Sequence, residues 1–194
     1  MPVMLDLEPP ARQLAQIVGG VTDDQLSGRT PNAGVNVRDL LAHVQGLALA
    51  FRDAADKAGS PAQDGAPGPA DLDPDWRTLI PERLTALAAA WSNPEAWEGT
   101  TKVGGLTMPG PAAGQVAVDE LVIHGWDLAR STRQPFSCDP ASLQASLEFV
   151  TMTQQQTDGA GREGLFGPAV EVPPDAPVID RIIGLSGRDP SWTP

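Results

Sequence analysis

The stretch DELVIHGWDLAR, residues 119–130, decides the fold of this chain. Its apolar side chains recur every three or four residues, which predicts an amphipathic helix, here extended over residues 112–132. Glu120, His124 and Asp127 follow one edge of the apolar stripe at the same spacing. Because residues four apart on a helix have Cβ atoms about 5–6 Å apart, Glu120 and His124 are expected to point the same way.

The chain has two histidines, and the second, His43, lies in another helical pattern. Asn36 is a suitable N-cap for a helix of about 20 residues that ends near residues 58–59. Two histidines and a carboxylate on two helices leave room for water or substrate at a metal, which is typical of a catalytic site rather than a structural one. The sequence therefore predicts divalent-metal ligands at His43, Glu120 and His124, and Asp127 as the group that orients His124.

Plainer interpretations of the same residues stay open. Glu120 and His124 have the spacing of an ordinary surface pair, which is common on helices. Asp39 lies four residues before His43, so an Asp39–His43 pair explains that histidine without any metal. The metal hypothesis gains weight because both histidines lie in the middle of long helices that can be neighbours in a bundle.

Three other features carry weaker signals. Arg130 is a candidate for binding an anionic substrate, but a surface salt bridge is the simpler interpretation. Cys138 lies just before a predicted helix start, which favours a lower thiol pKa. No histidine is left to act as its base, so we interpret Cys138 as an incidental loop thiol. The five tryptophans are expected in the core.

The rest of the chain predicts an all-α fold. Helical patterns cover residues 8–18, 74–91, 140–156 and a short segment at 179–185, and Pro81 predicts a kink or a helix start inside the second of these. Residues 97–107 are typical of an extended excursion or a small hairpin. Residues 59–73 and the tail from residue 159 are rich in Gly and Pro, which indicates long loops. We expect four main helices in one domain spanning residues 1–194.

Composition narrows the classes of partner. The chain has 194 residues, 41% of them hydrophobic, and a net charge of −12, which argues against a nucleic-acid backbone or an anionic membrane surface as a partner. The single cysteine excludes an intrachain disulfide and suits a reducing cytoplasm. No signal peptide and no apolar run of spanning length is present, so we expect a cytoplasmic protein.

Residues 119–130 resemble the signature helix of the DinB-like superfamily and, more narrowly, the metal-binding domain family of mycothiol-dependent maleylpyruvate isomerase. The resemblance extends to VRDLLAH (residues 37–43), AWSNPEAW (residues 90–97), Gly167-Pro168 and GRDPSW (residues 187–192), so it covers essentially the whole chain. It implies a DinB-like four-helix bundle with long loops and a short C-terminal extension. It also implies zinc or nickel held by His43, Glu120 and His124.

The resemblance further implies a low-molecular-weight thiol of the mycothiol type as cosubstrate, together with an electrophilic substrate, in a transfer or an isomerisation. The characterised isomerase carries a further C-terminal domain, whereas only residues 157–194 follow the fifth predicted helix. We therefore expect the thiol-dependent class rather than maleylpyruvate isomerisation itself. Two alternatives stay open: a non-catalytic metal- or ligand-binding bundle of the stress response, and a stress-induced structural protein with a vestigial site. A homodimer also stays open.

Overall fold

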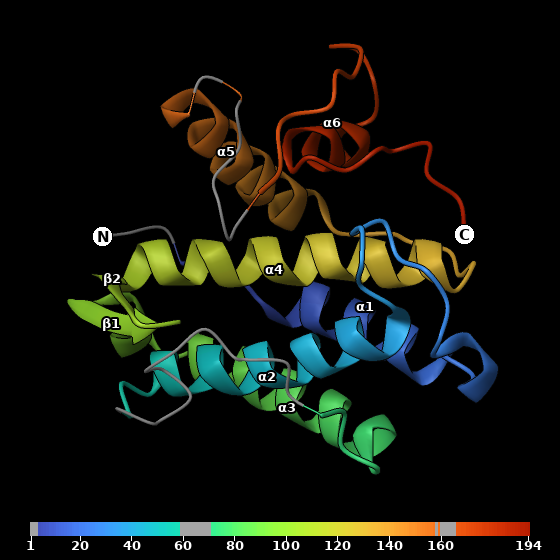
Figure 1. Ribbon diagram of the computed structural model, residues 1–194. Coiled ribbons are helices and arrows are strands. Elements are labelled where there is room, and N and C mark those ends of the chain that lie inside the picture. Colours follow the sequence, from blue (N-terminus) through green and yellow to red (C-terminus); the bar gives the residue numbers. More distant parts are fainter. Residues whose placement is uncertain (1–3, 59–70, 158, 160–165) are drawn as a thin grey trace.

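The computed structural model describes residues 4–58, 71–157, 159 and 166–194 as a bundle of helices with one small hairpin. Figure 1 shows α4 (Gly110–Ser131) running through the middle of the molecule. On one side of it lie α1 (Glu8–Gly19), α2 (Val37–Ala55) and α3 (Trp76–Trp91), and on the other lie α5 (Pro140–Gln156) and α6 (Val178–Leu185). Because α4 contacts α1, α2 and α5, it holds the two sides together.

The predicted all-α fold is confirmed. The excursion after α3 is a short 3-10 helix, Pro94–Trp97, followed by the antiparallel strands β1 (Thr100–Val103) and β2 (Leu106–Pro109). Gly104 and Gly105 join the strands with φ values of 57° and 80°, as a two-residue hairpin turn of primed type requires. A second 3-10 helix, Asp23–Gln25, lies between α1 and α2.

Two predicted boundaries differ from the structure. α2 ends at Ala55, a few residues before the predicted end near residues 58–59. α3 begins at Trp76 and continues through Pro81, so a helix start at Pro81 is wrong. The turn before Pro81 buries Trp76 and Ile80 in the core, and this burial favours a helix across the proline. The predicted loop at residues 59–73 and part of the tail lie largely outside the described residues.

The core between α3 and α4 is built on paired tryptophans. Trp97 Nε1 donates to the carbonyl of Trp91 at 2.7 Å, Trp91 Nε1 donates to the carbonyl of Phe51 at 3.0 Å, and the two indole rings meet edge to face. Gly114 of α4 lies directly against Trp97, since a Cβ there would come within 2.5 Å of the ring. The predicted core role holds for four of the tryptophans, whereas Trp192 is only partly buried.

None of the helices in the described ranges combines the length and the apolar character that crossing a membrane would require.

A methyl group at position 114 should separate α4 from Trp97. We expect Gly114→Ala to lower the free energy of unfolding by about 1–3 kcal/mol, as overpacked cores do. The matched control is Gly19→Ala, because Gly19 is also helical and its added Cβ would meet no atom within 4 Å. The control should be neutral or slightly stabilising. Chemical denaturation followed by circular dichroism measures both, and equal stabilities would contradict the packing argument.

Candidate metal centre

α2 brings His43 to the face of α4 from a well-defined start. Asn36 Oδ1 accepts from the Asp39 backbone N–H at 2.9 Å, and Asp39 Oδ2 accepts from the Asn36 backbone N–H at 3.3 Å, which closes a capping box. Asp39 is therefore engaged at the helix end, and the polar partners of His43 lie across the bundle on α4.

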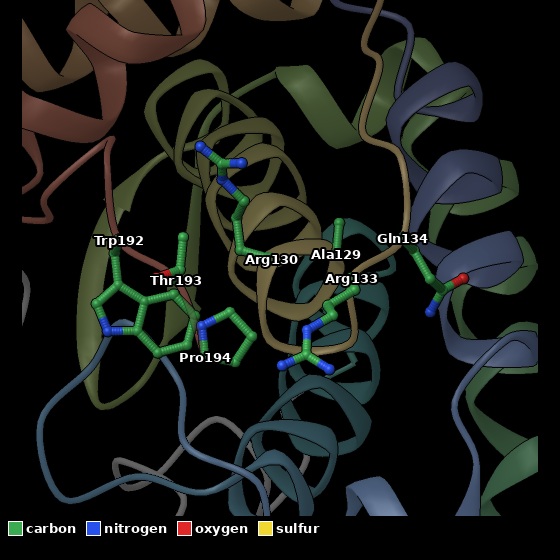
Figure 2. A pocket seen from close by; sticks show the side chains of 7 residues that line it. All are labelled: Ala129, Arg130, Arg133, Gln134, Trp192, Thr193 and Pro194. Atoms are coloured by element: carbon green, nitrogen blue, oxygen red, sulfur yellow. The ribbon is translucent and has the colours of Figure 1, made fainter.

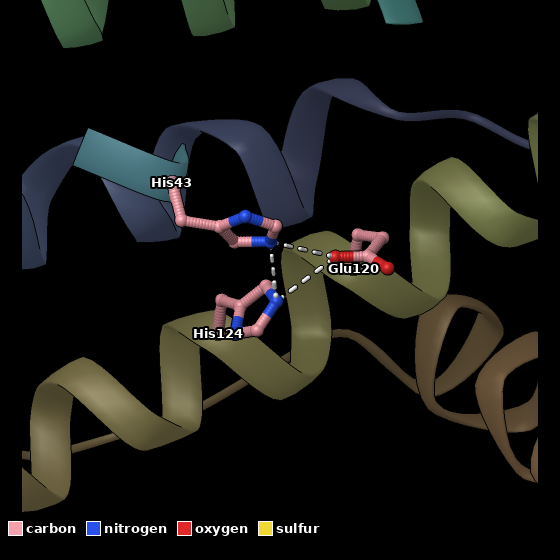
Figure 3. A group of neighbouring side chains, drawn as sticks. All are labelled: His43, Glu120 and His124. Atoms are coloured by element: carbon pink, nitrogen blue, oxygen red, sulfur yellow. Dashed lines mark hydrogen bonds and ion pairs between the residues drawn. The ribbon is translucent and has the colours of Figure 1, made fainter. Parts of the chain in front are cut away.

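The structure brings together all three residues predicted as ligands, as Figure 3 shows. His124 Nε2 lies 2.9 Å from Glu120 Oε2 and 3.1 Å from His43 Nε2. His43 Nε2 lies 3.5 Å from the same Glu120 oxygen. One turn of α4 supplies the Glu120–His124 pair, and α2 supplies the third group, as helical spacing predicted.

His43 Nε2, His124 Nε2 and Glu120 Oε2 all carry lone pairs. Atoms of this kind repel one another at such short distances unless positive charge lies among them. Glu120 Oε2 is buried, and within the described ranges of the chain it has no polar partner apart from the two imidazole nitrogens. Burial alone would raise the pKa of Glu120, but hydrogen bonds from His124 and His43 outweigh it and hold that pKa well below its usual range. Burial would likewise lower the pKa of His124, but Asp127 and Glu120 outweigh it and raise that pKa to about 9. Without a metal, a proton on His124 therefore supplies the charge.

The donor set also suits a divalent first-row cation in place of that proton. With ligand bonds of about 2.0–2.1 Å, neighbouring ligand atoms are about 3.3 Å apart around a tetrahedral ion and about 2.9 Å apart around an octahedral one. The observed separations of 2.9, 3.1 and 3.5 Å bracket both values. The His43 side chain is 43% exposed, against 12% for His124, so the open side of the cluster lies next to His43.

Asp127 contacts His124 as the spacing predicted, with Oδ2 lying 3.2 Å from Nδ1. The carboxylate is fully buried, and two further residues hold it: Arg188 forms a two-pronged ion pair with it, and Asn32 Nδ2 donates to Oδ2 at 3.2 Å. Burial would raise the pKa of Asp127, but Arg188 and His124 outweigh it and keep that pKa low. Sequence reasoning missed Asn32 and Arg188, although GRDPSW was noted as a motif.

A second buried carboxylate lies beside the cluster. Asp119 precedes Glu120 on α4 and accepts a hydrogen bond from Ser146 Oγ of α5 at 2.5 Å. Burial raises the pKa of Asp119 to about 8, even though the Ser146 hydrogen bond lowers it. Asp119 is therefore protonated at neutral pH, and it joins α4 to α5 just behind the cluster.

Two cavities lie near the C-terminal end of α4, and neither is lined by the three clustered residues. One of about 490 Å³ contains Arg130, Arg133 and Trp192, and in Figure 2 the two guanidinium groups point in different directions. The other, of about 390 Å³, lies between residues 27–36 and Trp192. Trp192 lines both cavities.

The weaker sequence candidates have structural roles. Arg130 Nη2 donates to the carbonyl of Pro190 at 2.7 Å and its guanidinium lies 5.4 Å from the centre of the Trp126 ring, which differs from the surface salt bridge that was the simpler expectation. Burial raises the pKa of the Cys138 thiol to about 12. The nearby helix start does not produce a reactive thiolate, which agrees with the interpretation of an incidental thiol.

Comparison with known proteins identifies one family and one fold. The family model described as "Mycothiol maleylpyruvate isomerase N-terminal domain" matches residues 7–129. Among solved structures, a histidine-to-alanine mutant of the mycothiol-dependent maleylpyruvate isomerase aligns with a TM-score of 0.63 at 19% identity, covering 88% of this chain and 75% of that one. Another structure of that isomerase aligns with a TM-score of 0.58 at 18% identity and the same coverage. No curated protein matches.

The raised pKa of Asp119 predicts a pH dependence of stability. The folded-state pKa of about 8 lies above the ordinary value of 3.8, so the stabilisation is complete below about pH 4 and is lost as the pH rises through about 8. Asp119→Asn keeps an acceptor for Ser146 without the titration. We expect this variant to be more stable than the wild type above pH 8 and to lose less stability between pH 5 and pH 9. Denaturation of the metal-free proteins across this range tests it; parallel profiles would contradict it.

Proposed function

Because the chain belongs to the mycothiol maleylpyruvate isomerase N-terminal domain family, we propose that it is a metal-dependent enzyme that uses a low-molecular-weight thiol of the mycothiol type. His43, Glu120 and His124 would bind the metal, with zinc and nickel as the candidate ions. Either ion accepts two imidazole nitrogens and a carboxylate oxygen.

One observation carries this proposal: Glu120 Oε2 is buried, and among the residues that the structure describes its only polar partners are the Nε2 atoms of the two histidines. A buried carboxylate oxygen needs compensating positive charge close to it. A proton on His124 can supply that charge, and so can a cation that is exchanged for the proton. Metal binding would then be linked to proton release, as it is wherever histidine nitrogens are ligands.

The bound cation would lower the pKa of a thiol at its open position and so supply a thiolate nucleophile at neutral pH. The residues of the chain would prepare that position. Glu120 and His124 are largely buried and fix two coordination directions, whereas the more exposed His43 leaves its side accessible to solvent. Asp127 holds Nδ1 of His124, which leaves Nε2 turned towards the cluster.

The thiol class comes from the family, whose description names mycothiol. In a transfer, the thiolate sulfur would form a bond to an electrophilic carbon, displace the leaving group of that carbon, such as the halide of a haloarene, and remain attached. In an isomerisation, it would add to an activated double bond, allow rotation about the resulting single bond, and then leave. Both reactions begin with the same thiolate, so the site is suited to either.

Metal content tests the ligand set directly. We expect the wild type, purified without a metal-binding tag, to carry close to one zinc or nickel ion per chain, and His124→Ala and Glu120→Gln to lose it. Glu148→Gln is the matched control, because Glu148 is an exposed α5 carboxylate that accepts from Gln144. Elemental analysis by mass spectrometry gives the result. A wild type that stays metal-free after reconstitution, or a Glu120→Gln variant that keeps its metal, would overturn the assignment.

The enzymatic part of the proposal is tested by whether turnover requires a thiol. With the metal-loaded protein, we expect consumption of an electrophile such as maleylpyruvate or a haloarene to require both mycothiol and metal, and to fall at least about 100-fold in Glu120→Gln, in line with loss of metal activation of a nucleophile. Product analysis would separate isomerisation from transfer. Stoichiometric metal without thiol-dependent turnover of a broad set of electrophiles would favour the non-catalytic metal-binding alternative.

A further inference from the structure

We propose that Arg188, which follows α6, is a positioning residue for the metal centre. Its guanidinium fixes the Asp127 carboxylate, and Asp127 in turn orients His124. This inference rests on the proposed function, because it concerns the same metal site. It adds a requirement that the family match does not contain, since Arg188 lies beyond residues 7–129.

The Arg188–Asp127 contact has the geometry of a rigid clamp. Arg188 Nε donates to Asp127 Oδ1 at 2.8 Å, and Nη2 donates to Oδ2 at 2.9 Å. The remaining nitrogen, Nη1, donates to the side chain and the carbonyl of Ser186 at 3.2 and 3.4 Å. The Arg188 side chain is 9% exposed and that of Asp127 is 0% exposed. Two parallel hydrogen bonds from a planar guanidinium fix the plane of the carboxylate, which a single ammonium cannot do.

The carboxylate plane sets the orientation of the His124 ring. Asp127 Oδ2 lies 3.2 Å from His124 Nδ1, and a proton on Nδ1 donated to this oxygen leaves Nε2 as the coordinating atom. Nε2 then lies 2.9 Å from Glu120 Oε2 and 3.1 Å from His43 Nε2. Rotation of the carboxylate would release Nδ1 and allow the ring to turn away from the cluster.

The backbone conformation after α6 places Arg188 beside Asp127. Gly187 has a φ of +83°, and an added Cβ would come within 2.8 Å of the Gly167 backbone, so a side chain is excluded there. The Arg188 backbone N–H donates to the carbonyl of Ile183 at 3.0 Å, which fastens the turn to α6. Arg130 Nη2 donates to Pro190 O, so a second contact ties the same segment to α4.

The metal affinity should therefore depend on Arg188. Removing a group that holds a ligating histidine from outside the coordination sphere typically weakens metal binding about 10–100-fold. Arg188→Lys keeps the buried positive charge and removes the two-pronged contact, so it separates orientation from charge balance. We expect this variant to fold and to bind metal about 10–100-fold more weakly than the wild type.

The test is titration of the full-length metal-free protein with cobalt(II), whose absorption spectrum reports ligand geometry, followed by competition with zinc. Arg130→Lys is the matched control, because Arg130 ties the same segment to the same helix without touching Asp127. Arg188→Lys should show the weaker affinity and an altered cobalt spectrum, whereas Arg130→Lys should match the wild type. A folded Arg188→Lys protein with wild-type affinity and spectrum would overturn the inference.

A second variant tests the same inference in case Arg188→Lys does not fold. The double substitution Asp127→Asn with Arg188→Gln removes both charges together, so no unpaired buried charge remains. It should also bind cobalt(II) at least about 10-fold more weakly, and wild-type affinity in the folded double variant would overturn the inference. A wild type that binds no cobalt(II) or zinc at one site per chain would overturn the metal assignment itself, and the role of Arg188 with it. The other negative result is different: if the wild type binds metal and Arg188→Lys binds it equally well, only the role of Arg188 is overturned.

Discussion

The buried carboxylate of Asp127 is the constraint on which the site depends. Its two oxygens contact His124 on α4, Arg188 after α6 and Asn32 before α2. A fully buried carboxylate is stable only when charge and hydrogen bonds compensate it, so all three segments must be in place together. The fold therefore couples the docking of its C-terminal segment to the orientation of a histidine in the cluster.

α4 carries residues of both the core and the candidate metal centre. Near its start, Gly114 allows close contact with Trp97, and further along Asp119 accepts from Ser146 on α5. Glu120 and His124 lie on the next, largely buried edge, where α2 brings His43 to them. Because α1 and α2 pack on one side of α4 and α5 packs on the other, this edge is held by two layers. Rigid support of this kind is what a preorganised ligand set requires.

The sequence was informative wherever the relevant spacing lay within one helix. The i, i+4 relation of Glu120 and His124 and the i, i+3 relation of His124 and Asp127 are set by helix geometry alone. His43 was found because histidines are scarce in this chain. Asn32 and Arg188 lie 95 and 61 residues from Asp127, and no periodicity reports such contacts. Asn32 also stands in a turn-rich stretch, where a polar residue is expected without a tertiary partner.

The same physical reasoning explains why the cluster is asymmetric. His124 is held through Nδ1 by a carboxylate, which itself is clamped, whereas His43 is more exposed and reaches the cluster from a separate helix. In the proposed function, His124 and Glu120 would hold the cation against the bundle while the side next to His43 admits the thiol. A more buried His43 would close the position that substrate needs, and a more exposed His124 would lose the orientation that Asp127 provides. In the proposed function, the division between one fixed and one accessible histidine would meet two demands on the site, which are to retain a cation and to leave it reachable.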